Sequence, residues 1–243
     1  MYTGLTADEI RITGHDGDEI NAYVAHPHGT GPFPAVAVIH HMPGWDEETI
    51  EAANRFAAHG YLAIVPNLHF RDAPGAAPDD AAAASRAAGG VPDERFLGDL
   101  AGAIAYLRSQ PASNQKVGVI GYCSGGRQAF LAACSSDIDA AVDCYGGFVV
   151  GDVPEGMPRN LKPILHLAPQ MRCPLLGLFG EVGSLLSALK KKQRDRTSYL
   201  GYEDSVIEEF GDVLWYFSNI AARANLDLNA LAHRMSRDLC GLG

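Results

Sequence analysis

The sequence lacks any apolar run long enough to cross a bilayer. Its longest apolar runs, such as 34–39 and 101–107, fall far short of the ~20 residues that a transmembrane helix needs. The first residues, MYTGLTADEI, also lack a basic region followed by an apolar one, so a secretory signal is not expected. These two absences predict a cytoplasmic protein with no membrane partner.

A cysteine framework and an excess of positive charge are missing as well. The 243 residues include five cysteines, an odd number at spacings that match neither a metal site nor a disulfide scaffold. Such usage suits a reducing cytosol. The net charge of −10 repels the phosphates of a nucleic acid. We therefore expect no structural disulfide and no nucleic-acid partner.

What the first 180 residues do contain is an alternation of short apolar runs with helical stretches. Nearly continuous apolar runs are typical of strands that are buried on both faces of a parallel sheet. The runs are 34–40, 61–65, 116–121, 138–144 and 174–179. The helical stretches are 46–59, 93–109 and 124–133. This element order predicts a wound α/β fold.

Two further segments complete that expectation. Alternating residues at 9–13 and 19–25, with a turn-like His-Asp-Gly between them, predict an antiparallel hairpin ahead of the parallel strands. The segment 72–92 is rich in alanine, proline, aspartate and glycine, and we interpret it as a loop or lid with a short helix.

The alternation of apolar runs and helical stretches stops after Gly180. Residues 203–224 carry apolar side chains at a spacing of three and four, which indicates an amphipathic helix. We expect an α/β domain over 1–180 and a helical segment over 181–243. The apolar face of 203–224 must be covered either by the sheet or by a second copy, so a homo-oligomer through these helices is expected.

A candidate nucleophile lies at Cys123. The sequence Gly-Tyr-Cys-Ser-Gly-Gly at 121–126 follows an expected strand and opens an expected helix, which is the context of a nucleophile elbow. Glycines at 121 and 125 allow the backbone to turn sharply and lift one side chain, that of Cys123, above the sheet. A helix N-terminus favours the thiolate, which is the attacking species.

The motifs GYCSGG, FRDAPG at 70–75 and CPLLGLFG at 173–180 together resemble the dienelactone hydrolase family over about three quarters of the chain. The resemblance implies an α/β-hydrolase sheet flanked by helices, here truncated at its C-terminal end. It also implies that Cys123 attacks the carbonyl of a small ester or lactone without a cofactor. By position, the amides of Met42 and Ser124 would bind the oxyanion, and Arg71 would clamp a substrate carboxylate.

The chain departs from the family pattern in its last quarter. Gly183 occupies the position of the triad aspartate, and nothing in 181–243 resembles the loop that carries the family's histidine. A substitute base is available, because His41 follows the expected strand at 34–40 and occupies a position where the family usually has a carboxylate near the thiol. Either His41 forms a Cys-His pair with Cys123, or its ring only forms hydrogen bonds within the loop.

The tail resembles a second family, the MazG-like nucleotide pyrophosphohydrolases, over about 176–240. This resemblance implies that Glu208, Glu209 and Asp212 on one helix, with Glu181 on another, bind Mg²⁺ through oxygen. Three hypotheses follow: ester or lactone hydrolysis through Cys123, impaired by the missing aspartate and histidine; magnesium-dependent pyrophosphate hydrolysis by the tail; and a non-catalytic fusion.

Overall fold

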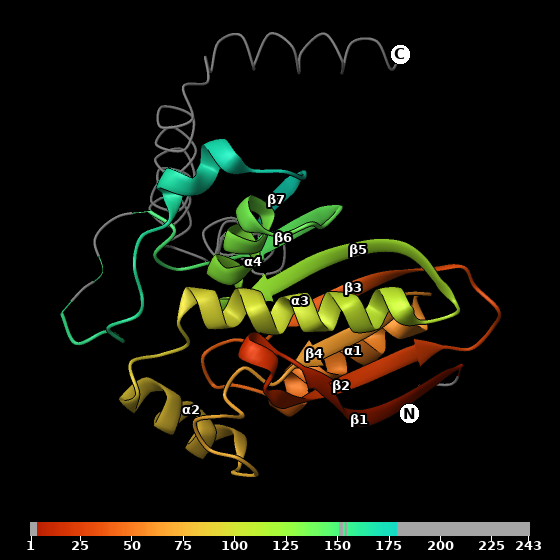
Figure 1. The fold of residues 1–243 in the computed structure, drawn as a ribbon, viewed down its shortest axis with the longest axis horizontal. Coiled ribbons are helices and arrows are strands. Elements are labelled where there is room, and N and C mark those ends of the chain that lie inside the picture. Colours follow the sequence, from red (N-terminus) through yellow and green to blue (C-terminus); the bar gives the residue numbers. More distant parts are fainter. Residues whose placement is uncertain (1–3, 151–152, 154, 179–243) are drawn as a thin grey trace, which may run out of the picture. The chain divides into compact units, whose positions relative to one another are not determined.

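A computed structural model describes residues 4–150, 153 and 155–178, which belong to one compact unit ending at Leu178. Seven strands form one sheet in the order β1-β2-β4-β3-β5-β6-β7 (Figure 1). Their bounds are β1 Leu5–Thr13, β2 Glu19–Pro27, β3 Phe33–Ile39, β4 Leu62–Pro66, β5 Ser113–Tyr122, β6 Ala140–Cys144 and β7 Leu175–Leu178. The pairs β1–β2 and β2–β4 are antiparallel, whereas the other neighbours are parallel.

Helices cover both faces of this sheet. The helices α3 and α4 lie on one face and α1 on the other, while α2 projects beyond the sheet (Figure 1). Their bounds are α1 Glu47–Ala58, α2 Pro78–Ala87, α3 Asp93–Ser109 and α4 Ser124–Ser135, with short 3-10 turns at His15–Gly17 and Leu165–Gln170. Among the described helices, none is long and apolar enough to cross a membrane.

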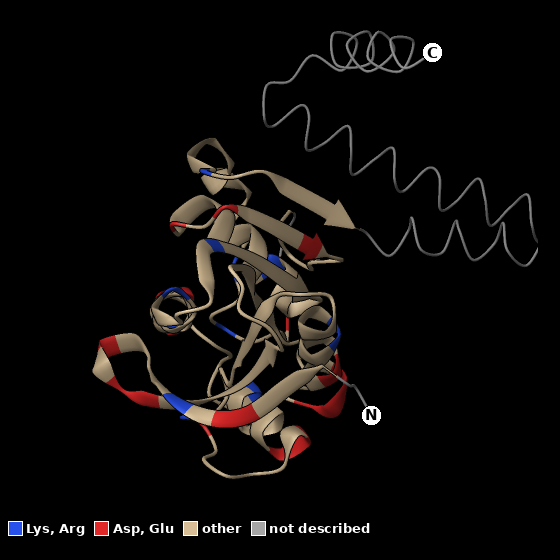
Figure 2. Ribbon diagram, turned by 90° about the vertical axis from the view of Figure 1, so that its right-hand side faces the viewer, with Lys and Arg blue, Asp and Glu red and all other residues tan. Residues whose placement is uncertain are grey.

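The two faces of β3 show how the sequence produces this layering. Val36 and Val38 pack with α1, whereas Ala37 and Ile39 pack with the core under α3 and α4. Because successive side chains of a strand point to opposite faces, a strand covered on both sides needs an unbroken apolar run. Charged residues are accordingly sparse on the central strands (Figure 2), and Asp143 in β6 is a buried exception.

The predicted α/β fold is confirmed. The expected hairpin is β1–β2, the five expected apolar runs are β3 to β7, and the lid segment contains α2. The last strand differs from the others in its surroundings. Within the described residues β7 pairs only with β6, and Leu176 and Leu178 are 56% and 47% exposed.

Candidate active site at the end of β5

Cys123 lies at the turn between β5 and α4. Its backbone has φ 53° and ψ −115°, a conformation that residues with a side chain rarely adopt. The turn is held by its own backbone bonds, since Cys123 N–H donates to the carbonyl of Cys144 at 2.9 Å and its carbonyl accepts from Gly126 N–H at 2.9 Å. The strained turn therefore depends on the end of β6 as well as on β5 and α4.

Glycines on both sides of Cys123 permit this turn because the backbone is crowded there. A Cβ atom on Gly121 would collide with the carbonyl oxygen of Gly125. A Cβ atom on Gly125 would collide with the carbonyl of Ile39 and lie 2.7 Å from that of His40. Neither glycine has a positive φ, so close approach rather than backbone freedom requires them here.

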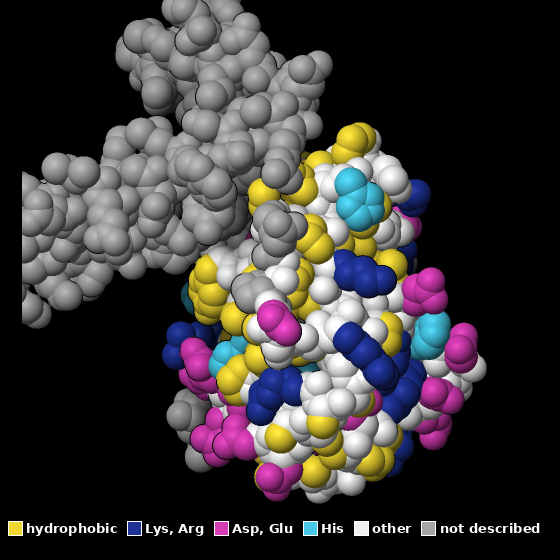
Figure 3. Space-filling model, turned by 90° about the vertical axis from the view of Figure 1, so that its left-hand side faces the viewer, with side chains coloured by type: hydrophobic (Ala, Val, Ile, Leu, Met, Phe, Trp, Pro, Cys, Tyr) yellow, Lys and Arg dark blue, Asp and Glu magenta, His cyan; other side chains and the backbone are white. Residues whose placement is uncertain are grey.

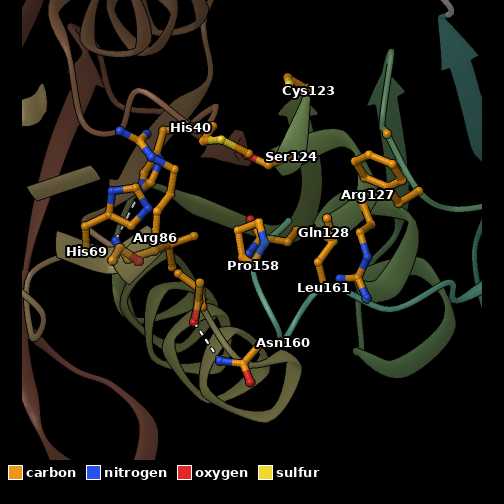
Figure 4. Close-up of a pocket in the computed structure, with 17 residues that line it drawn as sticks. His40, His69, Arg86, Cys123, Ser124, Arg127, Gln128, Pro158, Asn160 and Leu161 are labelled. Atoms are coloured by element: carbon orange, nitrogen blue, oxygen red, sulfur yellow. Dashed lines mark hydrogen bonds between the residues drawn. The ribbon is translucent and has the colours of Figure 1, made fainter. Parts of the chain in front are cut away.

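Cys123 lines a cavity of about 100 Å³. In Figure 4, Cys123 and Ser124 lie at the top, His40, His69 and Arg86 on one side, and Arg127, Gln128 and Leu161 on the other. Met42 lines the same cavity, so three of the sequence-predicted site residues come together. Within the described residues, the amide N–H of neither Met42 nor Ser124 donates to a protein acceptor.

His40 is buried in the wall of this cavity. Its Nε2 atom lies 3.3 Å from the amide nitrogen of Leu68, and its Nδ1 atom lies 2.9 Å from the carbonyl oxygen of His41. Because an amide can only donate, Nε2 must accept and the proton must be on Nδ1. Burial lowers the pKa of His40 to about 3. His40 is therefore a neutral structural link with both nitrogens occupied, and it is not available as a base.

His69 is a second buried imidazole in the same wall. Its ring packs edge-on against that of His40, with the centroids 4.7 Å apart. Its Nδ1 atom is buried without a hydrogen-bond partner among the described residues, and burial lowers the pKa of the ring to about 4. His69 thus adds a neutral ring to the cavity wall.

His41 lies elsewhere. It lines a neighbouring cavity, and its Nε2 atom is 2.6 Å from Oδ2 of Asp46. Asp46 also caps α1, because its Oδ1 accepts the amide N–H of Thr49 at 3.0 Å. Hydrogen bonds to the His41 ring and to Thr49 lower the pKa of Asp46, against the opposing effect of burial. Among the described residues, no hydrogen bond joins the Cys123 thiol to a histidine.

Arg71 is not among the residues that line the Cys123 cavity, and its placement does not support the expected clamp role. Its guanidinium binds both carboxylate oxygens of Asp99 at 2.9 Å and one oxygen of Asp18 at 2.9 Å. The Asp99 side chain is fully buried, and Arg71 links it in α3 to Asp18 in the turn between β1 and β2. Arg71 is a structural residue in this arrangement.

Two other arginines line the cavity. Arg127 is 3% exposed and forms a two-pronged ion pair with Asp93 at 2.7 and 3.0 Å, so its charge is already neutralised. Arg86, on α2, is exposed and forms no ion pair with a described residue. Among the described side chains that line the cavity none is acidic, which leaves Arg86 as its uncompensated charge.

A buried carboxyl group lies behind the elbow. Asp143 in β6 is 2% exposed, and its Oδ1 accepts the amide N–H of Gly146 at 2.8 Å. The same oxygen occupies the space that a side chain on Gly126, in the first turn of α4, would need. Burial raises the pKa of Asp143 to about 6, partly opposed by the Gly146 hydrogen bond.

Several predicted residues lie outside the described part of the chain. They are Gly183, at the position of the family's aspartate, and the candidate magnesium ligands Glu181, Glu208, Glu209 and Asp212. The domain boundary expected at Gly180 and the oligomer contact expected through 203–224 also fall there.

Comparison with known proteins decides the family. The model of the dienelactone hydrolase family matches residues 20–202. The chain belongs to the dienelactone hydrolase family. The match extends beyond Gly180, where the family sequence was expected to end.

Two curated relatives of the family illustrate the likeness. A provisionally named carboxymethylenebutenolidase of Methylorubrum extorquens is 34% identical over 180 residues, which cover 73% of this chain and 60% of that protein. The carboxymethylenebutenolidase of Pseudomonas putida is 33% identical over 177 residues, which cover 71% of this chain and 70% of that enzyme. The chain therefore spans roughly two thirds of the length of these relatives.

Solved structures agree on the fold. A crystal structure from Klebsiella pneumoniae, provisionally named a dienelactone hydrolase, has a TM-score of 0.61 and 25% identity and covers 89% of this chain and 99% of that chain. The dienelactone hydrolase-like promiscuous phosphotriesterase P91, from metagenomic libraries, has a TM-score of 0.52 and 18% identity and covers 90% of this chain and 99% of that chain. At the identity of P91, the likeness concerns the fold alone.

Proposed function

We propose that the protein hydrolyses small carboxylic esters or lactones through Cys123. The observation that carries this proposal is the placement of Cys123 on a strained turn beside a cavity. The amides of Met42 and Ser124 line the same cavity and have no acceptor in the part of the chain that the structure describes. Such amides are suited to bind an oxyanion, because the negative charge of a tetrahedral intermediate supplies the acceptor that each lacks. The curated relatives named carboxymethylenebutenolidase belong to the same family.

The proposed base is His41, oriented by Asp46. A base that is itself hydrogen-bonded to a carboxylate matches the logic of the catalytic triad, in which the acid fixes the imidazole and stabilises its protonated form. The 2.6 Å contact between Asp46 and the His41 ring supports this assignment. His41 must come into hydrogen-bond reach of the thiol in the substrate complex, where catalytic contacts often tighten.

The reaction has two steps. His41 takes the thiol proton, and the Cys123 sulfur attacks the carbonyl carbon, so that the carbonyl π electrons move to the oxygen facing Met42 and Ser124. Collapse of this intermediate breaks the ester C–O bond, and His41 returns the proton to the leaving oxygen. In the second step His41 takes a proton from water, and the water oxygen attacks the thioester carbon. Collapse of this intermediate breaks the C–S bond and releases the acid, and His41 returns the proton to the sulfur.

The cavity favours an acyl group that carries a carboxylate. Arg86 contributes an uncompensated positive charge, and Lys and Arg side chains lie near the middle of the face shown in Figure 3. The remaining wall is largely apolar, with Leu68, Val91 and Leu161 among its members. A short apolar acyl chain with a terminal carboxylate fits this combination of charge and surface.

Turnover of an activated aryl ester by the full chain tests the proposal. We expect release of the phenol in wild type and a loss of at least about 1,000-fold in Cys123→Ala. Cys173→Ala is the matched control, because Cys173 is a half-buried thiol that does not line the cavity. Equal turnover in wild type and Cys123→Ala would refute the proposal. Stoichiometric labelling of Cys123 by an acylating ester, detected by mass spectrometry, adds a readout that does not depend on the second step.

A further inference from the structure

The second cavity, of about 230 Å³, has Tyr122, the residue before the nucleophile, in its wall. Tyr122 and Cys123 are consecutive, yet Cys123 lines the first cavity and Tyr122 the second. The walls of the second cavity come from His41, from Tyr122 and Tyr145 near the ends of β5 and β6, and from residues of α1. The α1 residues are Glu48, Thr49, Glu51, Ala52 and Arg55. The two cavities share no lining residue, but they meet twice along the chain, at His41–Met42 and at Tyr122–Cys123.

Two tyrosine rings form one wall of this second cavity. The centroids of Tyr122 and Tyr145 are 6.3 Å apart, with the ring planes inclined at 47°. Tyr145 is 49% exposed and has a positive φ of 47°, so a large ring is presented to solvent on a strained backbone. Strain of this kind persists where the surrounding structure requires it, and it clusters at ligand sites.

The second cavity also differs from the first in charge. Glu48 forms no ion pair with a described residue, whereas Glu51 pairs with Arg55 at 3.2 Å. Glu48 lines this cavity together with both tyrosines, and one of its carboxylate oxygens lies within 4.8 Å of a ring nitrogen of His41 and an oxygen of Asp46. The guanidinium of Arg55 lies in the same wall and is paired with Glu51. Two ring faces beside an unpaired carboxylate attract a cation, in contrast to the Arg86 side of Cys123.

We propose that this second cavity binds the cationic alcohol portion of an ester substrate, an ammonium group held against Tyr122 and Tyr145 and near Glu48. The inference rests on the function proposed for Cys123. The acyl group then occupies the first cavity, and the leaving oxygen lies on the side that His41 lines, where the departing alcohol needs a proton. The preferred substrate is an open-chain ester of an amino alcohol.

A pair of isosteric esters tests this inference. A choline ester and its 3,3-dimethylbutyl counterpart have the same shape, but a neutral carbon replaces the charged nitrogen in the second. With the full chain and a pH-stat assay, we expect kcat/KM for the choline ester to exceed that of the neutral ester by about 5- to 30-fold. The ratio should fall toward one in Tyr145→Leu and in Glu48→Gln. It should persist in Tyr61→Leu, since Tyr61 is an exposed tyrosine outside both cavities.

Titration with tetramethylammonium chloride provides a readout that does not need turnover. We expect saturable binding to the full chain, measured by ligand NMR at constant ionic strength, and its loss in Tyr145→Leu. Hydrolysis of both esters at equal kcat/KM would overturn the cation site while the function of Cys123 stands. Saturable binding without hydrolysis of either ester, in protein that turns over the activated aryl ester, would overturn the assignment of this cavity to the alcohol portion of a substrate. Absence of binding would overturn the cation site.

Discussion

The Nε2 atom of His41 lies 2.6 Å from Oδ2 of Asp46, while Oδ1 of the same carboxylate accepts the amide N–H of Thr49 at 3.0 Å. The side chain of Asp46 thus caps the N-terminus of α1 and orients the imidazole ring of His41. The orientation of His41 depends on the helix that covers one face of the sheet, although His41 itself lies in the loop after β3.

Asp46→Asn separates these two roles. Asparagine is as good a helix cap as aspartate, so the free energy of unfolding should change by less than about 0.5 kcal/mol. Loss of the negative charge beside the imidazole should lower kcat for an aryl ester by about 100-fold or more. Asp46→Ala is the comparison variant and should also lose about 1 kcal/mol of stability with the cap. Wild-type kcat in Asp46→Asn would exclude the pair from catalysis.

Arg71 and Arg86 should respond to substitution in opposite ways. Arg71→Ala leaves the fully buried carboxylate of Asp99 without its partner, and we expect a loss of about 3–5 kcal/mol in urea unfolding. Arg86→Ala removes an exposed side chain with no ion pair to a described residue, so stability should stay within about 0.5 kcal/mol. Its effect should be a rise in KM for esters with a carboxylate on the acyl group. An unchanged KM for such esters would remove Arg86 from substrate binding.

The crowding at the elbow predicts a sharp contrast between two glycines. Gly125→Ala places a methyl group against the carbonyls of Ile39 and His40, and we expect a loss of more than about 3 kcal/mol or failure to fold. Gly147→Ala, in open space at the edge of the same cavity, should change stability by less than about 0.5 kcal/mol. Thermal melts of the two variants provide the measurement, and equal melting temperatures would contradict the crowding around Gly125.

Asp143 predicts a stability difference that depends on pH. Its pKa is raised to about 6 by burial, so the folded state holds a proton that the unfolded state releases between about pH 3.8 and 6. The carboxylate therefore destabilises the fold above pH 6, and this cost disappears as the pH falls toward 3.8. Asp143→Asn should be more stable than wild type by about 1–2 kcal/mol at pH 8, with a smaller difference at pH 4.5. Urea unfolding at both pH values checks this, and a difference that grows toward acid pH would contradict it.

The sequence predicted the fold well because the central strands β3 and β4 are buried on both faces. The runs that became β3 to β7 needed no alternation to be recognised, and the helical stretch expected at 46–59 became α1, Glu47–Ala58. The tight turn at Cys123 could be predicted from the glycines at 121 and 125, which are needed because the backbone there is crowded by neighbouring carbonyls.

The rest of the site depends on contacts between distant segments. Nothing near Arg71 in the sequence indicates that its guanidinium engages Asp18 and Asp99, which lie 53 and 28 residues away. His41 and Asp46 are five positions apart, and their pairing depends on the path of the loop between β3 and α1. Arg86 reaches the cavity only because of where α2 is placed. Patterns within a single sequence do not indicate which residues from distant segments come into contact.

The packing of Gly121 and Gly125 against neighbouring carbonyls also limits where new substrate preferences can arise. Random libraries that include these positions should consist mainly of unfolded protein, whereas libraries over α2 and residues 158–161 can change the cavity wall without disturbing the turn. Variants selected for altered specificity should therefore carry substitutions in the cavity wall and keep the wild-type residues at the turn.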